Sequence, residues 1–90
     1  MLFVATMNVK PGAPGPKERI ARRAQWKYPE GVKVIGEYWL QGKPAVISIC
    51  EVDNIAPIIA MTAEWGDVFD INVFPAVTAE EGLALASQMS

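Results

Sequence analysis

The chain has 90 residues, of which 51% are hydrophobic and 20% are charged, with one cysteine, no histidine and a net charge of −2. The absence of histidine excludes His-ligated metal and haem sites and both Ser–His–Asp and Cys–His catalysis, and the apolar composition excludes disorder. One cysteine, an N-terminus without the basic region of a signal peptide, and apolar runs well short of the roughly 20 residues that span a bilayer predict a single cytoplasmic domain over residues 1–90, with no membrane partner.

Charge is distributed unevenly along the chain. Residues 10–43 hold all eight basic side chains and three acidic ones, a net charge of +5, whereas residues 44–90 hold seven acidic side chains and no basic one, a net charge of −7. The two halves either neutralise each other within one domain, or attract a second copy or an anionic ligand near the first helix. The pI near 5.0 argues against nucleic acid as a partner.

The first third of the chain predicts a strand and a helix. Residues 2–9 are an apolar run of strand-forming residues, which a turn rich in proline and glycine ends. Pro16 suits the first turn of a helix that runs toward Tyr28. Ile20, Ala24 and Tyr28 recur at four-residue spacing, so one face of this helix is apolar.

The middle of the chain predicts a hairpin and a second helix. Residues 32–40 and 45–52 are strand-forming and are joined by turn residues at 41–44, so they are expected to pair antiparallel. Asp53 or Asn54 can cap the helix that follows. Its apolar stripe is expected to contain Ile55, Ile58, Ile59, Thr62 and Trp65.

The remaining elements complete a known order. Residues 68–74 alternate apolar with polar and form a fourth strand that Pro75 closes. Thr78 and Glu81 have the spacing of a capping box, which begins a last helix. The order β-α-β-β-α-β followed by a helix predicts an α+β ferredoxin-like fold, in which the first strand lies between the third and the fourth.

The predicted sheet has two different faces. The apolar set expected under the helices is Phe3, Ala5, Met7, Ile47, Ile49, Phe69, Ile71 and Val73. The opposite set is mixed and contains Thr6, Asn8, Ser48, Cys50, Asp70 and Asn72. Helices on one side leave the other face open, and a second subunit commonly covers such a face, so we expect a homodimer.

Two segments carry a resemblance to a known family. Residues 29–38 (PEGVKVIGEY) and 64–75 (EWGDVFDINVFP) resemble a family of small uncharacterised proteins, a domain of unknown function in the dimeric α+β-barrel superfamily. The resemblance covers most of the chain, from the first strand to about Pro75. It implies two ferredoxin-like subunits packed sheet against sheet and no particular reaction. The wider superfamily includes cofactor-free monooxygenases, isomerases, ligand binders and haem-binding members, and a chain without histidine departs from the last of these.

Trp26 allows two interpretations. If the first helix continues to it, the indole stands on the basic face beside Arg22 and Arg23 as a ligand platform or a partner anchor. If the helix unwinds before Pro29, because residues before proline avoid the helical conformation, Trp26 folds inward.

Strand residues supply the other candidates. Tyr38 and Trp39 end the second strand on opposite faces, so one enters a core or pocket and the other meets a partner subunit. The open face gathers four polar side chains: Thr6, Asn8, Asp70 and Asn72. There Asp70 is either a base with a raised pKa or part of a polar network that fixes the dimer register, and the same alternatives apply to Glu37.

Two functions remain open. In the first, the chain binds a small organic molecule, as a plain binder or as a cofactor-free enzyme of monooxygenase, isomerase or cyclase type. The candidate ligand-binding residues are Thr6, Asn8, Trp26, Tyr38, Trp39 and Asn72, and the candidate catalytic residues are Asp70 and Tyr38. In the second, it is a non-catalytic dimeric interaction or accessory module. We expect no cofactor and no metal, since without histidine and with one cysteine only carboxylates remain as ligands.

Overall fold

The computed structural model of the chain describes residues 1–89 and confirms the predicted order of elements. Its strands and helices are β1 (Leu2–Val9), α1 (Pro16–Gln25), β2 (Lys33–Trp39), β3 (Val46–Glu51), α2 (Ala56–Trp65), β4 (Phe69–Ala76) and α3 (Ala79–Met89). This βαββαβα order is that of an α+β ferredoxin-like fold with a C-terminal helix. Within residues 1–89, no helix combines the length and the apolarity needed to cross a membrane.

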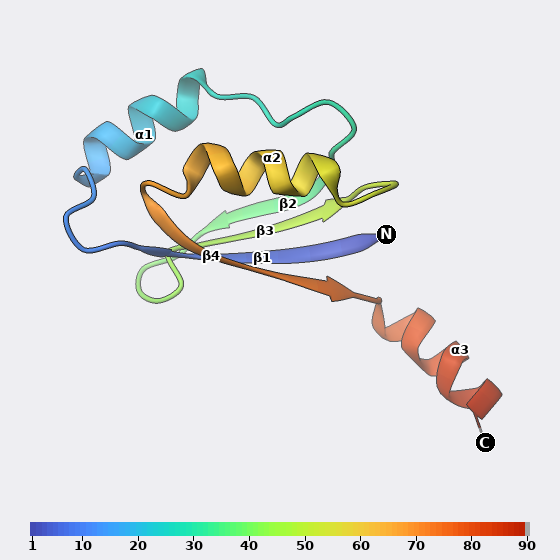
Figure 1. Cartoon of the computed structure of the whole chain (residues 1–90). Helices are drawn as coiled ribbons and strands as arrows, with labels where there is room; N and C mark the ends of the chain where they lie inside the picture. Colours follow the sequence, from blue (N-terminus) through green and yellow to red (C-terminus); the bar gives the residue numbers. More distant parts are fainter. Residues whose placement is uncertain (90) are drawn as a thin grey trace.

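The four strands form one antiparallel sheet in the order β2-β3-β1-β4, so β1 lies between β3 and β4 as predicted. In Figure 1, α1 and α2 lie above the same face of the sheet, and neither covers the opposite face, which we call the open face. The two helices differ in how they pack. α2 buries three of its side chains, whereas α1 buries none.

The core lies between α2 and the sheet. Every second residue of β1 is buried beneath the helix, as the two-residue period of a strand requires. The buried residues of β1 and α2 are Phe3, Ala5, Met7, Ile58, Met61 and Trp65. The predicted stripe was wrong at Ile55 and Ile59, which are exposed, because α2 begins only at Ala56 and its buried face follows a different set of positions.

β3 directs toward the helices the set of side chains that was predicted for the opposite face. Its pairing with β1 places Ser48 beside Ala5 and Cys50 beside Phe3, on the face toward the helices. Ile47 and Ile49 therefore lie on the open face, which corrects the assignment made from hydrophobicity. The polar Ser48 is tolerated in the core because its hydroxyl has hydrogen-bond partners there.

The C-terminal ends of α1 and β4 differ from those that the sequence pattern predicts. α1 ends at Gln25, and Trp26 has extended backbone angles (φ −94°, ψ 143°). The inward interpretation of Trp26 is thereby confirmed, because its side chain packs against the buried cluster around Trp65. β4 continues through Pro75 to Ala76 instead of closing there, which is possible because β4 is an edge strand and proline lacks only an N–H donor.

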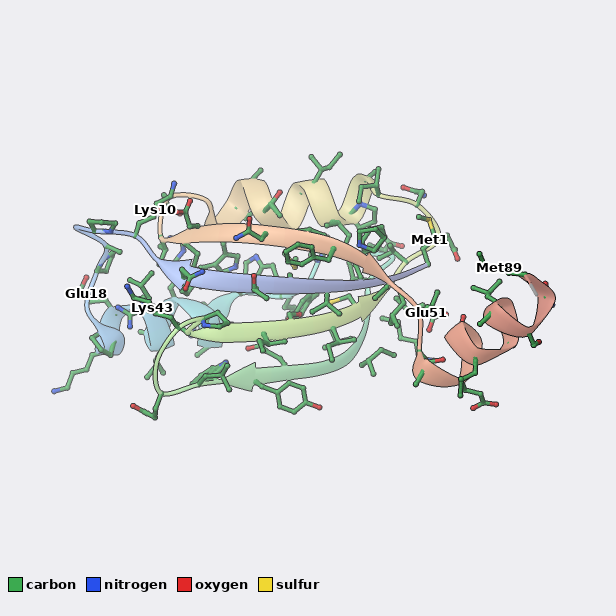
Figure 2. The ribbon with its side chains drawn as sticks, turned by 90° about the horizontal axis from the view of Figure 1, so that it is seen from below. Met1, Lys10, Glu18, Lys43, Glu51 and Met89 are labelled. Atoms are coloured by element: carbon green, nitrogen blue, oxygen red, sulfur yellow. The ribbon has the colours of Figure 1, made fainter. Side chains whose placement is uncertain are left out.

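α3 begins at the predicted capping box. The Glu81 amide donates to Thr78 Oγ1 at 3.1 Å, and the Thr78 hydroxyl donates to the Glu81 carboxylate at 3.1 Å. The helix then leads away from the sheet (Figures 1 and 2) and buries none of its described side chains. Leu83, Leu85 and Met89 are exposed as a result.

Adjacent isoleucines on α2 test this packing. Ile58 is 2% exposed and Ile59 is 59% exposed, so the same substitution samples the core and the outer surface. We expect Ile58→Ala to lower the free energy of unfolding by about 2–5 kcal/mol, through lost burial and a new cavity. Ile59→Ala should change it by no more than about 0.5 kcal/mol. Urea unfolding followed by circular dichroism measures both, and equal losses would contradict the assignment of the buried face.

Candidate functional site

A cavity of about 210 Å³ lies between α1, the segment that follows it, and the sheet. Its lining includes Leu40, Gln41 and Ala45, so it is near the end of the sheet where the β2–β3 connection lies. In Figure 1, this connection is the loop below α1. Side chains from α1, β2, α2 and the segment after α1 line it, among them Ile20, Trp26, Tyr28, Trp39, Met61 and Trp65. Ile20 of α1 thus borders a cavity rather than a packed core, which explains why it remains half exposed.

Aromatic rings form a continuous part of the cavity wall. The Trp26 ring centroid lies 4.7 Å from that of Tyr28 and 5.7 Å from that of Trp65, the latter in an edge-on arrangement. The Arg23 guanidinium lies 5.4 Å from the centroids of both Trp26 and Tyr28. Tilted ring contacts and a cation over the ring faces are both attractive. They fix the position of Trp26 although it lies outside any helix or strand.

The carboxylate of Glu37 is the polar centre of the site. Arg23 donates to it through Nη2 at 2.9 Å and through Nε at 3.1 Å, the Tyr28 hydroxyl donates at 2.6 Å, and the Trp39 indole N–H donates at 2.7 Å. The side chains of Glu37 and Arg23 are 17% and 32% exposed, so the ion pair is partly removed from water. One carboxylate therefore connects α1, the following segment and β2.

Protonation at this centre is fixed near neutral pH. Burial raises the pKa of Glu37, but the hydrogen bonds from Arg23, Tyr28 and Trp39 outweigh burial and hold the pKa below its ordinary value. Burial and the hydrogen bond to Glu37 raise the pKa of the Tyr28 hydroxyl. Glu37 is thus a carboxylate and Tyr28 a protonated phenol. Their pKa values lie on opposite sides of neutrality, which is unsuitable for proton transfer at pH 7.

The polar network continues to β3. The Tyr28 hydroxyl lies 3.0 Å from Ser48 Oγ, which lies 3.3 Å from Cys50 Sγ. Burial raises the pKa of the Cys50 thiol, so the thiolate needed for nucleophilic or metal chemistry is disfavoured. Nor do any three Cys, Asp or Glu side chains in residues 1–89 lie close enough together to hold a metal ion.

Contacts outside the cavity attach α1 to the end of α2. Arg22 donates to the Asp67 carboxylate at 2.9 Å and to the Glu64 carbonyl at 2.5 Å, and its guanidinium lies 4.6 Å from the Trp65 ring centroid. The Trp26 indole N–H donates to the Glu64 carboxylate. These contacts hold the C-terminal half of α1, while its N-terminal half borders the cavity.

The structure divides the predicted ligand-binding residues between the two faces of the sheet. Trp26 and Trp39 line the cavity, whereas Tyr38 pairs with Ile47 and lies on the open face, so Tyr38 and Trp39 are on opposite faces as predicted. The other candidates also lie on the open face, as the pairs Thr6–Asn72 and Asn8–Asp70. A single chain therefore does not bring these polar groups and the two tryptophans into one pocket.

Several site residues were not found from the sequence. Glu37 was considered without its partners, and Arg23, Tyr28 and Ser48 were not considered as parts of a polar centre. One signal was available, because Glu37 and Trp39 are two residues apart in a strand and so share a face. Their partners come from a helix and a loop, and no spacing in the sequence indicates that these lie over β2.

Comparison with known proteins gives a family and no closer relative. A family model described as a domain of unknown function (DUF3303) matches residues 1–90. Neither a curated protein nor a solved structure matches the chain. The family match includes every element from β1 to α3.

The role of the Glu37 carboxylate can be tested by removing its charge. Glu37→Gln keeps the size of the side chain but leaves the half-buried Arg23 without an ionic partner. We expect the free energy of unfolding at pH 7 to fall by about 1–3 kcal/mol. Asp67→Asn is the matched control, since it removes the carboxylate of the exposed pair with Arg22 and should cost distinctly less. Equal losses in the two variants would contradict a special role for Glu37.

The lowered pKa of Glu37 also predicts that the stability of the fold depends on pH. The pKa of Glu37 is lower in the folded chain than its ordinary value of 4.5, so the ionised carboxylate favours folding. This contribution is present in full above about pH 4.5 and is lost as the pH falls through the lowered pKa. Urea unfolding from pH 7 to pH 3 should therefore show the stability difference between the parent and Glu37→Gln shrinking in acid. A difference that is constant over this range would count against the ion pair.

Proposed function

We propose that this chain, which belongs to the DUF3303 family, a domain of unknown function, binds a small organic molecule in the cavity beneath α1. The observation that carries the proposal is the cavity itself, which is lined by three tryptophans and bordered by a helix that buries none of its side chains. Ligand sites are typically concave and mostly apolar, with a few fixed polar groups. The volume of about 210 Å³ is below the roughly 300–1,000 Å³ of sites for drug-sized ligands, which limits the ligand to one or two rings.

The polar centre favours binding over proton-transfer chemistry. A general acid or base works best with a pKa near the operating pH, and the pKa values of Glu37 and Tyr28 are shifted away from it. Both side chains are engaged with each other and with Arg23, so they define the shape and charge of one wall. A ligand would meet fixed donors and acceptors there.

We also propose that a second copy of the chain covers the open face. Ile35, Tyr38 and Phe74 each lie more than half exposed, and Ile47 and Ile49 extend the apolar area between them. Figure 2 looks onto this face, where no helix lies across the strands. Contiguous apolar surface of this kind on a small domain marks an interaction site. A sheet-to-sheet homodimer is also what the resemblance to dimeric α+β barrels implies.

Close packing of Tyr38 supports a flat contact surface. A Cβ atom at position 36 would lie 2.6 Å from the Tyr38 hydroxyl oxygen, so the Tyr38 ring lies across Gly36 in the space that a side chain would occupy. Where α3 leaves the sheet, a second hollow is lined by Leu2, Ile35, Ile49 and Val77. Apolar side chains of a second copy would fit such a hollow. If the dimer forms and no ligand binds, the chain is instead a non-catalytic dimeric module.

Ligand binding can be tested by filling the cavity. Ile20 lines it and is half exposed, so Ile20→Trp adds bulk there without disturbing the buried core. Neutral 2-naphthol, a two-ring probe, should shift the backbone amide resonances of residues around Trp39 and Trp65 in the parent chain. Its affinity should fall at least about tenfold in Ile20→Trp, because the new indole takes the same space.

The control places the same indole elsewhere. Ile59→Trp adds it on the exposed side of α2, away from the cavity, and should leave 2-naphthol binding unchanged. Spectra in which millimolar 2-naphthol, indole and 2-naphthoate all fail to shift the cavity resonances would reject the proposed function.

Dimer formation has a direct measurement. Light scattering at micromolar concentration should give twice the 9.8 kDa chain mass. Phe74→Glu places a charge on the open face and should shift the mass toward that of the monomer, because an unpaired charge buried between two sheets is unfavourable. Ile59→Glu, on the outer side of α2, should remain a dimer. A parent chain that stays monomeric at high concentration would exclude this assembly.

A further inference from the structure

We propose that the ligand of the cavity is a planar aromatic molecule with one negative charge, and that Arg19 binds its anionic group. This inference rests on the proposed binding function and adds the chemical class of the ligand. It follows from the charges of the cavity wall and from their partners.

Three charged residues line the cavity, and two of them neutralise each other. Arg23 and Glu37 form an ion pair at 2.9 Å. Arg19 is the third, and its guanidinium donates from Nη1 to the Pro14 carbonyl at 2.6 Å. Within residues 1–89 the ion pairs of the chain are Arg22–Asp67 and Arg23–Glu37, so the charge of Arg19 has no carboxylate partner there. The cavity wall therefore carries a net charge of +1.

Arg19 has donors to spare for a ligand. A guanidinium has five N–H groups in a fixed planar arrangement that fits a carboxylate with two parallel hydrogen bonds. The hydrogen bond to the Pro14 carbonyl uses one of these groups, and Arg19 is among the residues that line the cavity.

The surroundings disfavour a cationic ligand. Clustered aromatic rings can bind an ammonium group, but three of the rings in this wall already have one of the chain's own cations over them. Arg23 lies over Trp26 and Tyr28, and Arg22 lies over Trp65. The Glu37 carboxylate, which could otherwise attract a cation, accepts hydrogen bonds from three side chains. An ammonium group would thus meet arginines and a carboxylate with little remaining acceptor capacity.

The electrostatic field of the basic side chains around the cavity also favours an anionic ligand. α1 carries four basic side chains, Lys17, Arg19, Arg22 and Arg23, and one acidic side chain, Glu18. In Figure 2, Lys10 and Lys43 lie at the α1 end of the sheet, and Glu51 lies at the opposite end. Positive side chains around a cavity raise the local concentration of anions. The charge asymmetry of the sequence therefore has a spatial counterpart at this site.

A series of probes with one ring system separates charge from shape. Calorimetric titration would compare 2-naphthoate, the neutral 2-naphthamide and the cationic 2-naphthylmethylammonium ion at low salt. The parent chain should bind 2-naphthoate at least about tenfold more tightly than the amide, because a charge-assisted hydrogen bond is about twice as strong as a neutral one. The ammonium ion should bind most weakly. The aliphatic anion octanoate should bind more weakly than 2-naphthoate, since it cannot stack on the rings.

Two charge variants on α1 locate the anion. Arg19→Gln should abolish the preference for 2-naphthoate over the amide, because the glutamine carries no charge and the acid loses more affinity than the amide. Lys17→Gln removes the same charge from an exposed position of the same helix, outside the cavity lining, and should keep the preference. If the parent binds acid and amide equally, the charge inference is overturned while the binding function stands. If the preference survives in Arg19→Gln, the assignment of Arg19 is overturned. If none of the probes binds, the binding function itself is rejected.

Discussion

The ion pair between Arg23 and the half-buried Glu37 carboxylate is the interaction that ties α1 to the sheet. α1 has no buried side chain, so it cannot be held over the sheet by hydrophobic packing in the way that α2 is. Its Arg23 instead reaches β2 and forms a two-donor contact with Glu37, which Tyr28 and Trp39 complete. Hydrogen bonds to a charged group are about twice as strong as neutral ones. The cavity lies between the helix held in this way and the sheet.

The same contact limits what the site can do. An ion pair that is partly removed from water gains Coulomb energy but pays in desolvation, so its net contribution to stability is modest even though breaking it is costly. The ion pair instead determines the positions of the side chains around it. It holds the Tyr28 ring against Trp26 and keeps both Glu37 and Tyr28 in fixed protonation states at neutral pH. The result is a shaped, aromatic wall with a defined charge.

The two faces of the sheet carry different kinds of side chain. The face toward the helices holds the core and the cavity, while the open face carries Tyr38, Phe74 and several isoleucines that a small domain cannot cover with its own helices. A chain of this size buries a limited share of its surface. The apolar side chains in excess of the core are found on the open face and on α3, which leads away from the sheet. The cavity and the open face lie on opposite sides of the sheet, so the proposed ligand site and the proposed dimer contact do not overlap.

The sequence by itself determined the element order and the capping box at Thr78, because these depend on local spacing and on turn residues. The strand order followed from the element order, through the usual topology of the ferredoxin-like fold. The sequence left two positions open for Trp26, and the structure decided for the inward one. Tertiary structure alone decided which face of β3 is buried, since the pairing with β1 and a hydrogen-bonded Ser48 outweigh hydrophobicity there. It also decided that Arg23 meets Glu37, because that contact joins a helix to a strand across a loop. Local sequence patterns indicate the period of a helix or a strand. They do not indicate which side chains of two separate elements will be in contact, because that depends on how the elements pack.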